Sequence, residues 1–343
     1  MKKKLLSAIL IIVFALTMTA CGGDNNTEAT EGEIQPMEIT IATPHPNSEN
    51  DPVYVYCKTF ADLVTKKTDG KITFDIQGDS VLGDDTEIAE GMVLVTLQMG
   101  ITSNAAVSSY DPAQQLYALP FLFKDDEEAN TFIDSEIAAK MNAGVEDDGL
   151  KIMSVLDGGF RQSLNTKGSI KQLGDFKGLK YRVPPMDLFT DTFKALGANA
   201  TPMSGAEVFT GLQQGTIDGC EFPIASIYSM QLYTAAKYID MTNHMFAAWY
   251  ACVSDELWES LTPEVQQIFT EAAAEANEAS RKAQIESVEA QIEEIEKAGG
   301  VVNWDVETDA MREAVQPILE SYRDKIGAEL YDEAMEYIES LRK

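Results

Sequence analysis

Short apolar runs alternate along the chain with segments whose apolar residues recur every three or four positions. Runs with the length and composition of strands lie at 39–42, 71–76, 151–156 and 181–183. Helical spacing is found at 187–196, at 204–213 and among Val55, Phe60, Leu63 and Val64. Strands that alternate with helices in this way favour an α/β fold with largely parallel strands.

One segment near the C-terminus predicts an unusually long helix. Thr262-Pro263 is a good helix start and Gly299-Gly300 a good stop, and the 36 residues from Pro263 to Ala298 lie between them. A helix of that length extends about 54 Å, which exceeds the reach of one domain of about 150 residues. We expect the helix either to bend or to span two lobes. A coiled-coil dimer is the competing interpretation, disfavoured because the apolar pattern fades into alanine through 271–283.

The N-terminus predicts export. Lys2, Lys3 and Lys4 precede an apolar run of 12 residues, 5–16, which is too short to span a bilayer. Cys21 follows small residues, as at a bacterial lipoprotein cleavage site, and a polar stretch follows it. We therefore predict a signal peptide at 1–20, a lipidated flexible tether at 21–36 and an extracytoplasmic body anchored to the cell membrane through Cys21. An ordinary signal peptide with an incidental cysteine is the alternative.

Composition narrows the classes of function. The 343 residues carry a formal net charge of −30, and 45% of them are hydrophobic, as expected for a folded acidic protein of about two domains. Such a charge repels nucleic acids and anionic lipids. Apart from Cys21 the cysteines are Cys57, Cys220 and Cys252, whose spacing fits neither a disulfide scaffold nor a zinc site. We expect buried free thiols, with a Cys220–Cys252 disulfide as the alternative.

The sequence lacks the signs of an enzyme. The two histidines, His45 and His244, have no nearby metal-ligand companion, and no glycine-rich phosphate loop or calcium loop occurs. Paired carboxylates are too common in so acidic a chain to indicate acid–base catalysis. We therefore predict a protein that is not an enzyme and that uses no cofactor or metal.

Several motifs, in order along nearly the whole mature chain, resemble those of the solute receptors of tripartite ATP-independent periplasmic (TRAP) transporters. Those motifs are ATPHP at 42–46, LGDD at 82–85, ALPF at 118–121, GLKYRVP at 178–184, the segment 207–221 that ends in DGCE, and TNH at 242–244. The resemblance implies a two-lobe fold like that of periplasmic binding proteins, with crossing hinge strands and the long C-terminal helix spanning both lobes. It places the first lobe at 37–157 plus about 247–285, and the second at 158–246 plus about 286–343.

The resemblance also implies a function without covalent chemistry. A monomeric receptor captures a small organic acid, a carboxylate, between its lobes and delivers it to the membrane subunits of a TRAP permease. A ligand-sensing receptor for a signalling kinase or another permease would use the same cleft. A secreted hydrolase or lyase is the rival from a different class, and it would turn its substrate over.

Two arginines match family positions near the ligand. Arg182 corresponds to the arginine that anchors the ligand carboxylate, for which a planar, permanently charged guanidinium is well suited. Arg161 follows Gly158-Gly159 and matches a second family arginine. A structural salt bridge between the lobes is the alternative role for Arg161.

The remaining candidate site residues follow from alignment with the family. Thr102, Ser103 and Asn104 fall at positions of polar ligand contacts, while Asp85 either orients a ligand hydroxyl or caps the next helix. His244 lies near the cleft or is a satisfied structural histidine.

The chain departs from the family pattern at three positions. Phe222 replaces an amide, Ser103 replaces an acid, and Gly205 stands where an aromatic residue is common. Phe222 forms an apolar wall or else turns into the core. These departures predict a preference for acids with an apolar or aromatic portion over sugar acids.

Overall fold

The computed structural model describes residues 34–343. The predicted signal peptide, the lipidation site Cys21 and most of the tether lie outside these residues. Within them, one nine-stranded mixed sheet organises the chain, in the order β2-β1-β3-β8-β4-β7-β5-β6 with β9 paired to β8. The strands are β1 Met37–Ala42, β2 Ile72–Gln77, β3 Met99–Ser103, β4 Leu150–Asn165, β5 Lys180–Val183, β6 Asn199–Pro202, β7 Gly219–Pro223, β8 Tyr238–Ser254 and β9 Val301–Asn303.

Helices cover the sheet on both faces. The α-helices are α1 Pro52–Lys67, α2 Asp85–Val93, α3 Asn104–Val107, α4 Asp126–Ile133, α5 Glu136–Ala143, α6 Asp187–Ala195, α7 Val208–Gln214, α8 Ile224–Ser229, α9 Asp255–Ser260, α10 Pro263–Lys297, α11 Asp309–Ile326 and α12 Ala328–Leu341. Short 3₁₀ helices occur at η1 Pro112–Ala118, η2 Gly144–Asp148, η3 Leu173–Phe176, η4 Gly205–Glu207 and η5 Leu232–Thr234. The helix predicted at 204–213 is therefore a 3₁₀ turn followed by α7.

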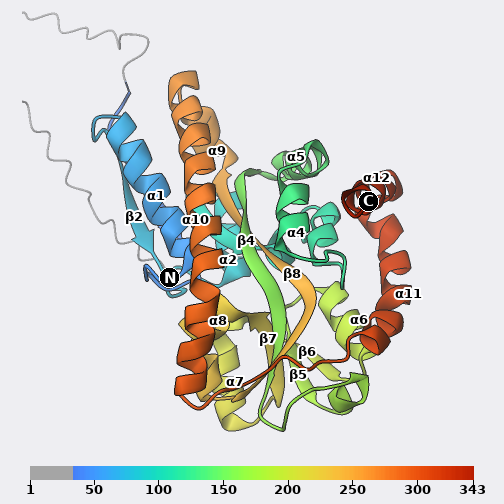
Figure 1. Cartoon of the computed structure of the whole chain (residues 1–343). Coiled ribbons are helices and arrows are strands. Elements are labelled where there is room, and N and C mark those ends of the chain that lie inside the picture. The colour runs from blue at the N-terminus through green and yellow to red at the C-terminus, as the bar shows by residue number, and fades with distance from the viewer. Residues whose placement is uncertain (1–33) are drawn as a thin grey trace, which may run out of the picture. The chain divides into compact units, whose positions relative to one another are not determined.

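The two longest strands, β4 and β8, run antiparallel through the middle of the sheet and join its two halves (Figure 1). On one side β1 pairs in parallel with β2 and β3, and on the other β5 pairs in parallel with β6 and β7. The expectation of largely parallel strands is thus correct for the outer strands and wrong for the centre. These crossing strands connect two lobes, whose predicted residue boundaries stay a prediction.

Strand β4 extends well beyond the run predicted at 151–156, because a bulge carries it past two glycines. The register with β8 shifts between Asp157 and Phe160. A Cβ on Gly158 would lie 2.6 Å from the indole nitrogen of Trp249, and Gly159 has a φ of +77°. Only glycine fits at both positions without strain.

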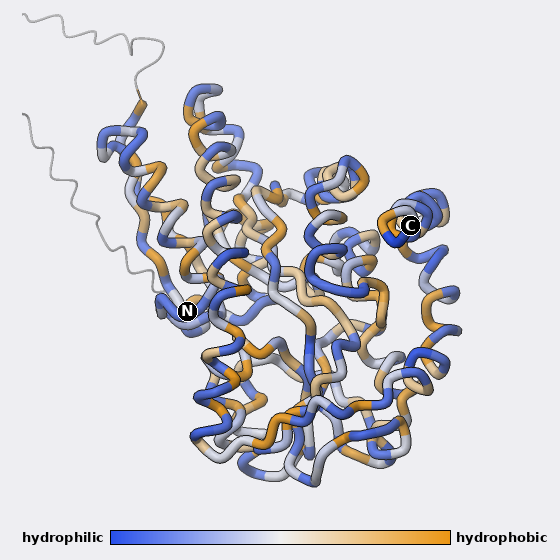
Figure 2. The backbone as a smooth tube through the Cα atoms, in the orientation of Figure 1, coloured by the Kyte–Doolittle hydropathy of each residue, from blue (hydrophilic) through white to orange (hydrophobic). Residues whose placement is uncertain are grey.

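The long helix is present as predicted. In α10 the Thr262 hydroxyl accepts a hydrogen bond from the backbone N–H of Val265, and the helix spans both lobes, packing on α1 in one and on α8 in the other (Figure 1). Hydrophilic and hydrophobic residues alternate along it (Figure 2). In its second half Ile292 and Ile295 are buried, whereas Ile285 is 61% exposed.

Buried polar side chains also attach α10 to the segment around the start of α1. Ser280 donates a hydrogen bond to the carbonyl of Pro52 over 2.7 Å, and the Gln291 amide donates to the carbonyl of Asn50 over 3.2 Å. The buried face of α10 therefore includes polar residues, which donate to backbone carbonyls at and just before the start of α1.

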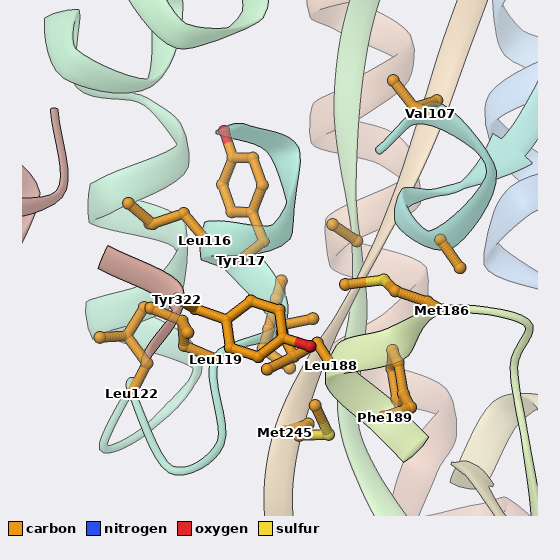
Figure 3. Close-up of a cluster of buried hydrophobic side chains, with 14 of the residues drawn as sticks. Val107, Leu116, Tyr117, Leu119, Leu122, Met186, Leu188, Phe189, Met245 and Tyr322 are labelled. Carbon is orange, nitrogen blue, oxygen red and sulfur yellow. The ribbon is translucent and has the colours of Figure 1, made fainter. Parts of the chain in front are cut away.

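Three hydrophobic clusters fill the interior. The largest brings together side chains from α3, η1, α6, β8 and α11, including Leu119, Leu188 and Tyr322 (Figure 3). Cys57, Cys220 and Cys252 are buried and unpaired, as expected. Among residues 34–343 no helix is long and apolar enough to cross a membrane.

Candidate binding site

Two adjoining cavities open where the lobes face each other. The inner cavity has a volume of about 40 Å³ and the outer one about 250 Å³. Residues that line both cavities are Asp84, Asp85, Gly205, Phe222 and Trp249. Together the cavities lie near the lower end of the range for small-molecule sites, roughly 300 Å³.

Strand direction explains why these residues meet. The lining segments 44–46, 79–85 and 103–106 follow the carboxyl ends of the parallel strands β1, β2 and β3. In the other lobe Arg182 lies one residue before the end of β5, and 204–206 follows β6. Ligands of α/β proteins bind beyond the carboxyl ends of parallel strands, and here two such edges face each other.

The guanidinium of Arg182 is buried at the inner cavity with part of its hydrogen-bonding capacity unused. The side chain is 3% exposed, and its Nε donates to the carbonyl of Met203 over 2.8 Å. Its Nη1 is buried without a hydrogen-bond partner. Burial and the like charge of Arg161 lower the pKa of Arg182 to about 10, which leaves it charged at neutral pH.

Arg161 also lines the inner cavity, but its charge is matched within the protein. Its Nε donates to one carboxylate oxygen of Glu221, and its Nη2 donates to the other over 2.9 Å. Both side chains are at most 4% exposed. Burial alone would raise the pKa of Glu221, yet the charge and the hydrogen bonds of Arg161 hold it below the ordinary value.

Phe222 lies against both guanidinium groups. The Cζ atoms of Arg182 and Arg161 are 4.9 Å and 5.4 Å from the centre of its ring. The ring lines both cavities and also belongs to the hydrophobic cluster of its lobe. The two roles foreseen for this position, cavity wall and core residue, therefore coexist.

The first lobe contributes polar groups from the end of β3 and the start of α2. Asn104 is 3% exposed and lines the inner cavity beside Ser103, and its Nδ2 has no hydrogen-bond partner. Oδ1 of Asp85 is likewise buried and unpartnered. Burial raises the pKa of Asp85, although the positive charges of His45 and Arg182 oppose the rise.

Two predicted site residues lie behind the cavity walls. Thr102 is fully buried, and its hydroxyl donates to the carbonyl of Asp85 over 2.6 Å. His244 lies behind Glu221, with Nε2 3.7 Å from a carboxylate oxygen, and Nδ1 is 2.7 Å from the Thr242 hydroxyl. Neither side chain lines the inner or the outer cavity. Asp84, not Asp85, caps α2.

Sequence reasoning missed much of the outer cavity. His45 lines it, with Nδ1 3.2 Å from a carboxylate oxygen of Asp51 and its ring edge-on to Trp249. Burial alone would lower the pKa of His45, but the charge and hydrogen bond of Asp51 raise it above the usual value. Asp79 and Ser80 lie on the turn after β2. One signal in the sequence could have identified these residues, because each comes shortly after a strand of the parallel part of the sheet.

The site can therefore hold a small hydroxylated anion. Arg182 Nη1 and Asn104 Nδ2 are free donors suited to a carboxylate, and Asp85 Oδ1 is a free acceptor suited to a hydroxyl. Buried polar atoms without partners are uncommon in folded proteins and call for an explanation. Around these cavities the described side chains offer no group of three potential metal ligands.

The sequence and the fold match those of known binding proteins. A family model described as bacterial extracellular solute-binding protein, family 7, matches residues 44–325. The 2,3-diketo-L-gulonate-binding periplasmic protein YiaO of Escherichia coli is 30% identical over 268 residues, which cover 78% of this chain and 82% of the relative. The C4-dicarboxylate-binding protein DctB of Bacillus subtilis is 27% identical over 302 residues, 87% of this chain and 86% of the relative.

Solved structures match over most of the chain as well. The sugar acid binding protein DctPAm from Advenella mimigardefordensis, in complex with galactonate, has a TM-score of 0.86 at 28% identity. The match covers 90% of this chain and 99% of that one.

Proposed function

Because this chain belongs to family 7 of the bacterial extracellular solute-binding proteins, we propose that it captures a hydroxylated carboxylate in the cleft and delivers it to the membrane subunits of a TRAP permease. At the coarser level it is an extracytoplasmic, TRAP-type solute-binding protein for organic acids and not an enzyme. The proposal concerns the ligand class, the residues that bind it and the delivery step.

One observation carries the proposal. Arg182 Nη1, Asn104 Nδ2 and Asp85 Oδ1 are buried, lack partners and belong to residues that line the same inner cavity. They come from β5, α3 and α2, so both lobes contribute. A carboxylate would satisfy the two donors, and a hydroxyl on the adjacent carbon would satisfy the acceptor.

The surroundings of these atoms favour a sugar acid, in contrast to the apolar acid that the sequence predicted. The face of Phe222 is already occupied by two guanidinium groups, which leaves less of it for an apolar ligand. The outer cavity offers hydroxyl and carboxylate side chains, including Asp79, Ser80 and Ser226, beside apolar ones such as Met230 and Trp249. The structurally similar protein from A. mimigardefordensis was solved with galactonate.

Membrane attachment through Cys21 is a further part of the proposal. It rests on the lysine-rich start, the apolar run and the polar tether of the sequence. Cys21→Ser should release the protein from membranes. Unchanged membrane retention of that variant, with no incorporation of labelled palmitate by the wild type, would contradict the anchor.

Binding can be tested on the purified body of the protein, residues 37–343. Thermal-shift screening of aldonates, uronates, aliphatic acids and aromatic acids would be followed by calorimetry and by mass spectrometry of any acid that co-purifies. The proposal expects one-to-one binding of a sugar acid without product formation. Tight binding of an aromatic acid with no binding of any sugar acid would contradict the ligand class, and turnover of a bound acid would contradict the receptor.

A further inference from the structure

Charged side chains are distributed unevenly between the two cavities. Asp84 and Asp85 line both, but Arg182 and Arg161 line only the inner cavity. The outer cavity adds Asp79, and among residues 34–343 no lysine or arginine lines it. From this polarity we infer that the cleft selects acids with a single carboxylate and rejects a second carboxylate at the far end of the ligand, an inference that rests on the proposed function.

The orientation of the ligand follows from the inner cavity. Arg182 and Asn104 are each 3% exposed, and each has a buried donor without a partner at this cavity. A carboxylate bound there directs the rest of the acid into the outer cavity, which is the larger of the two. The far end of the ligand then lies in the cavity that Asp79 and Asp84 line.

The N-terminus of α2 offers no site for a second anion. Helix N-termini attract anions through their free N–H groups and the helix dipole. Here Oδ1 of Asp84 accepts from the backbone N–H groups of Thr86 and Glu87 at 3.0 Å and 3.1 Å. Glu87 in turn accepts from the N–H of Asp84 over 3.0 Å. The carboxylates of the chain itself occupy the donors that an anionic ligand would need.

Within the described part of the chain, His45 is the one basic side chain that lines the outer cavity, and its charge is already matched. Its Nδ1 is 3.2 Å from a carboxylate oxygen of Asp51, which is 1% exposed. A positive charge so closely paired with a buried carboxylate leaves little attraction for another anion.

The consequence is a division among acids of the same carbon skeleton. Aldonates and uronates, which carry one carboxylate and several hydroxyls, suit both cavities. Aldarates, in which both ends are carboxylates, and short dicarboxylates place one negative charge beside Asp79 and Asp84. By this inference the chain differs in specificity from its B. subtilis relative, whose name describes C4-dicarboxylate binding.

Matched pairs of acids test the inference. Calorimetry would compare D-gluconate with D-glucarate, D-galactonate with galactarate, and D-erythronate with meso-tartrate, because the members of each pair differ only in a terminal CH₂OH or carboxylate. In the pair that binds best, we expect the monocarboxylate to bind at least about 100-fold more tightly than the dicarboxylate. The reason is that like charges brought together cost several kcal/mol.

Charge-neutral variants identify the residues responsible. The double variant Asp79→Asn, Asp84→Asn removes both charges, and the asparagine at position 84 can still cap α2. It should reduce the ratio of monocarboxylate to dicarboxylate affinity at least about tenfold. Glu90→Gln, on the exposed part of α2 away from the cavities, removes a charge without lining the site and should leave the ratio unchanged. High salt should also narrow the wild-type ratio, because Asp79 is exposed and its charge is screened.

The outcomes separate this inference from the proposed function. A dicarboxylate bound within threefold of its monocarboxylate partner overturns the inference while leaving the binding protein in place. A large ratio that neither the double variant nor salt narrows overturns the assignment to Asp79 and Asp84. No binding of any acid in the panel overturns the proposed function and the inference together.

Discussion

The two buried arginines at the inner cavity differ in what surrounds them. Both stack on Phe222, but the guanidinium of Arg161 is bound by the carboxylate of Glu221, whereas Nη1 of Arg182 has no partner. A buried charge is expensive unless it is paired. Arg161 is satisfied by the fold itself, and Arg182 is left for a ligand. The difference supports the proposal that Arg161 has a structural role and that Arg182 binds the ligand.

A structural salt bridge was the alternative role that the sequence left open for Arg161. Strand β4 carries Arg161 and β7 carries Glu221, and the two strands pair in the middle of the sheet. The ion pair therefore ties a crossing strand to the second lobe. Any contact between Arg161 and a ligand would use the donors that remain after its three hydrogen bonds to Glu221.

Breaking the Arg161–Glu221 pair should have the largest effect. Glu221→Gln is expected to lower the free energy of unfolding by about 3–5 kcal/mol, because it leaves a buried guanidinium without its counter-charge. Arg161→Met combined with Glu221→Leu should recover much of that loss, since it removes both charges. Chemical denaturation of the three proteins measures the effect, and a loss below 1 kcal/mol for Glu221→Gln would contradict the structural role.

Acid should weaken the same pair. The pKa of Glu221 in the folded protein lies below its ordinary value of 4.5. Its stabilising contribution is therefore fully present above pH 4.5 and is lost as the pH falls toward the folded-state pKa. The difference in unfolding free energy between wild type and Glu221→Gln should narrow below pH 4.5. A difference that is constant from pH 7 to pH 3 would show that the pair does not depend on an ionised Glu221.

Removing Arg182 should lower the affinity for the ligand without lowering the stability of the fold. Arg182→Ala is expected to cost about 2–5 kcal/mol of ligand affinity, because the ligand carboxylate loses a charge-assisted contact in a buried site. Arg182→Lys should recover only part of this, since lysine lacks the planar fork. The free energy of unfolding should stay level or rise, because an unpaired buried charge is removed.

A surface arginine provides the control for this prediction. Arg281 forms a two-point contact with Asp134 away from both cavities, and Arg281→Ala should leave the affinity as it is. Calorimetric affinity within twofold of wild type for folded Arg182→Ala would remove the distinction between the two arginines.

The smallest expected effect comes from Phe222, whose ring contacts both Arg161 and Arg182. Phe222→Leu should weaken ligand binding by about 0.5–2 kcal/mol, because it removes the aromatic face that positions the guanidinium of Arg182. Phe222→Tyr keeps that face and should bind nearly as well as wild type. Equal affinities for the leucine and tyrosine variants would show that the ring acts only as a spacer.

The sequence predicts the outer parts of this fold better than its centre. The helix α10 was predicted to within one residue at its end, because proline and paired glycines mark its limits. The crossing strand β4 was predicted only as far as residue 156, since Gly158-Gly159 interrupts the alternation that identifies a strand. Strand β8 was not among the strands predicted from the apolar pattern, because burial on both faces removes the alternation.

The candidate site shows the same limit. Residues at the inner cavity, such as Arg182 and Asn104, were found through motifs that resemble those of a family. The pairing of Arg161 with Glu221 and the convergence of Asp79 and His45 on one cavity depend on which strands are neighbours. Strand order is set by long-range packing, which no local pattern in the sequence reports.

The most direct test of the two roles is a crystal structure of the protein with the best-bound monocarboxylate. The account predicts that the ligand carboxylate accepts hydrogen bonds from Arg182 Nη1 and Asn104 Nδ2 while the Arg161–Glu221 pair stays intact. A carboxylate bound to Arg161, with Glu221 displaced and Arg182 still unpartnered, would contradict it.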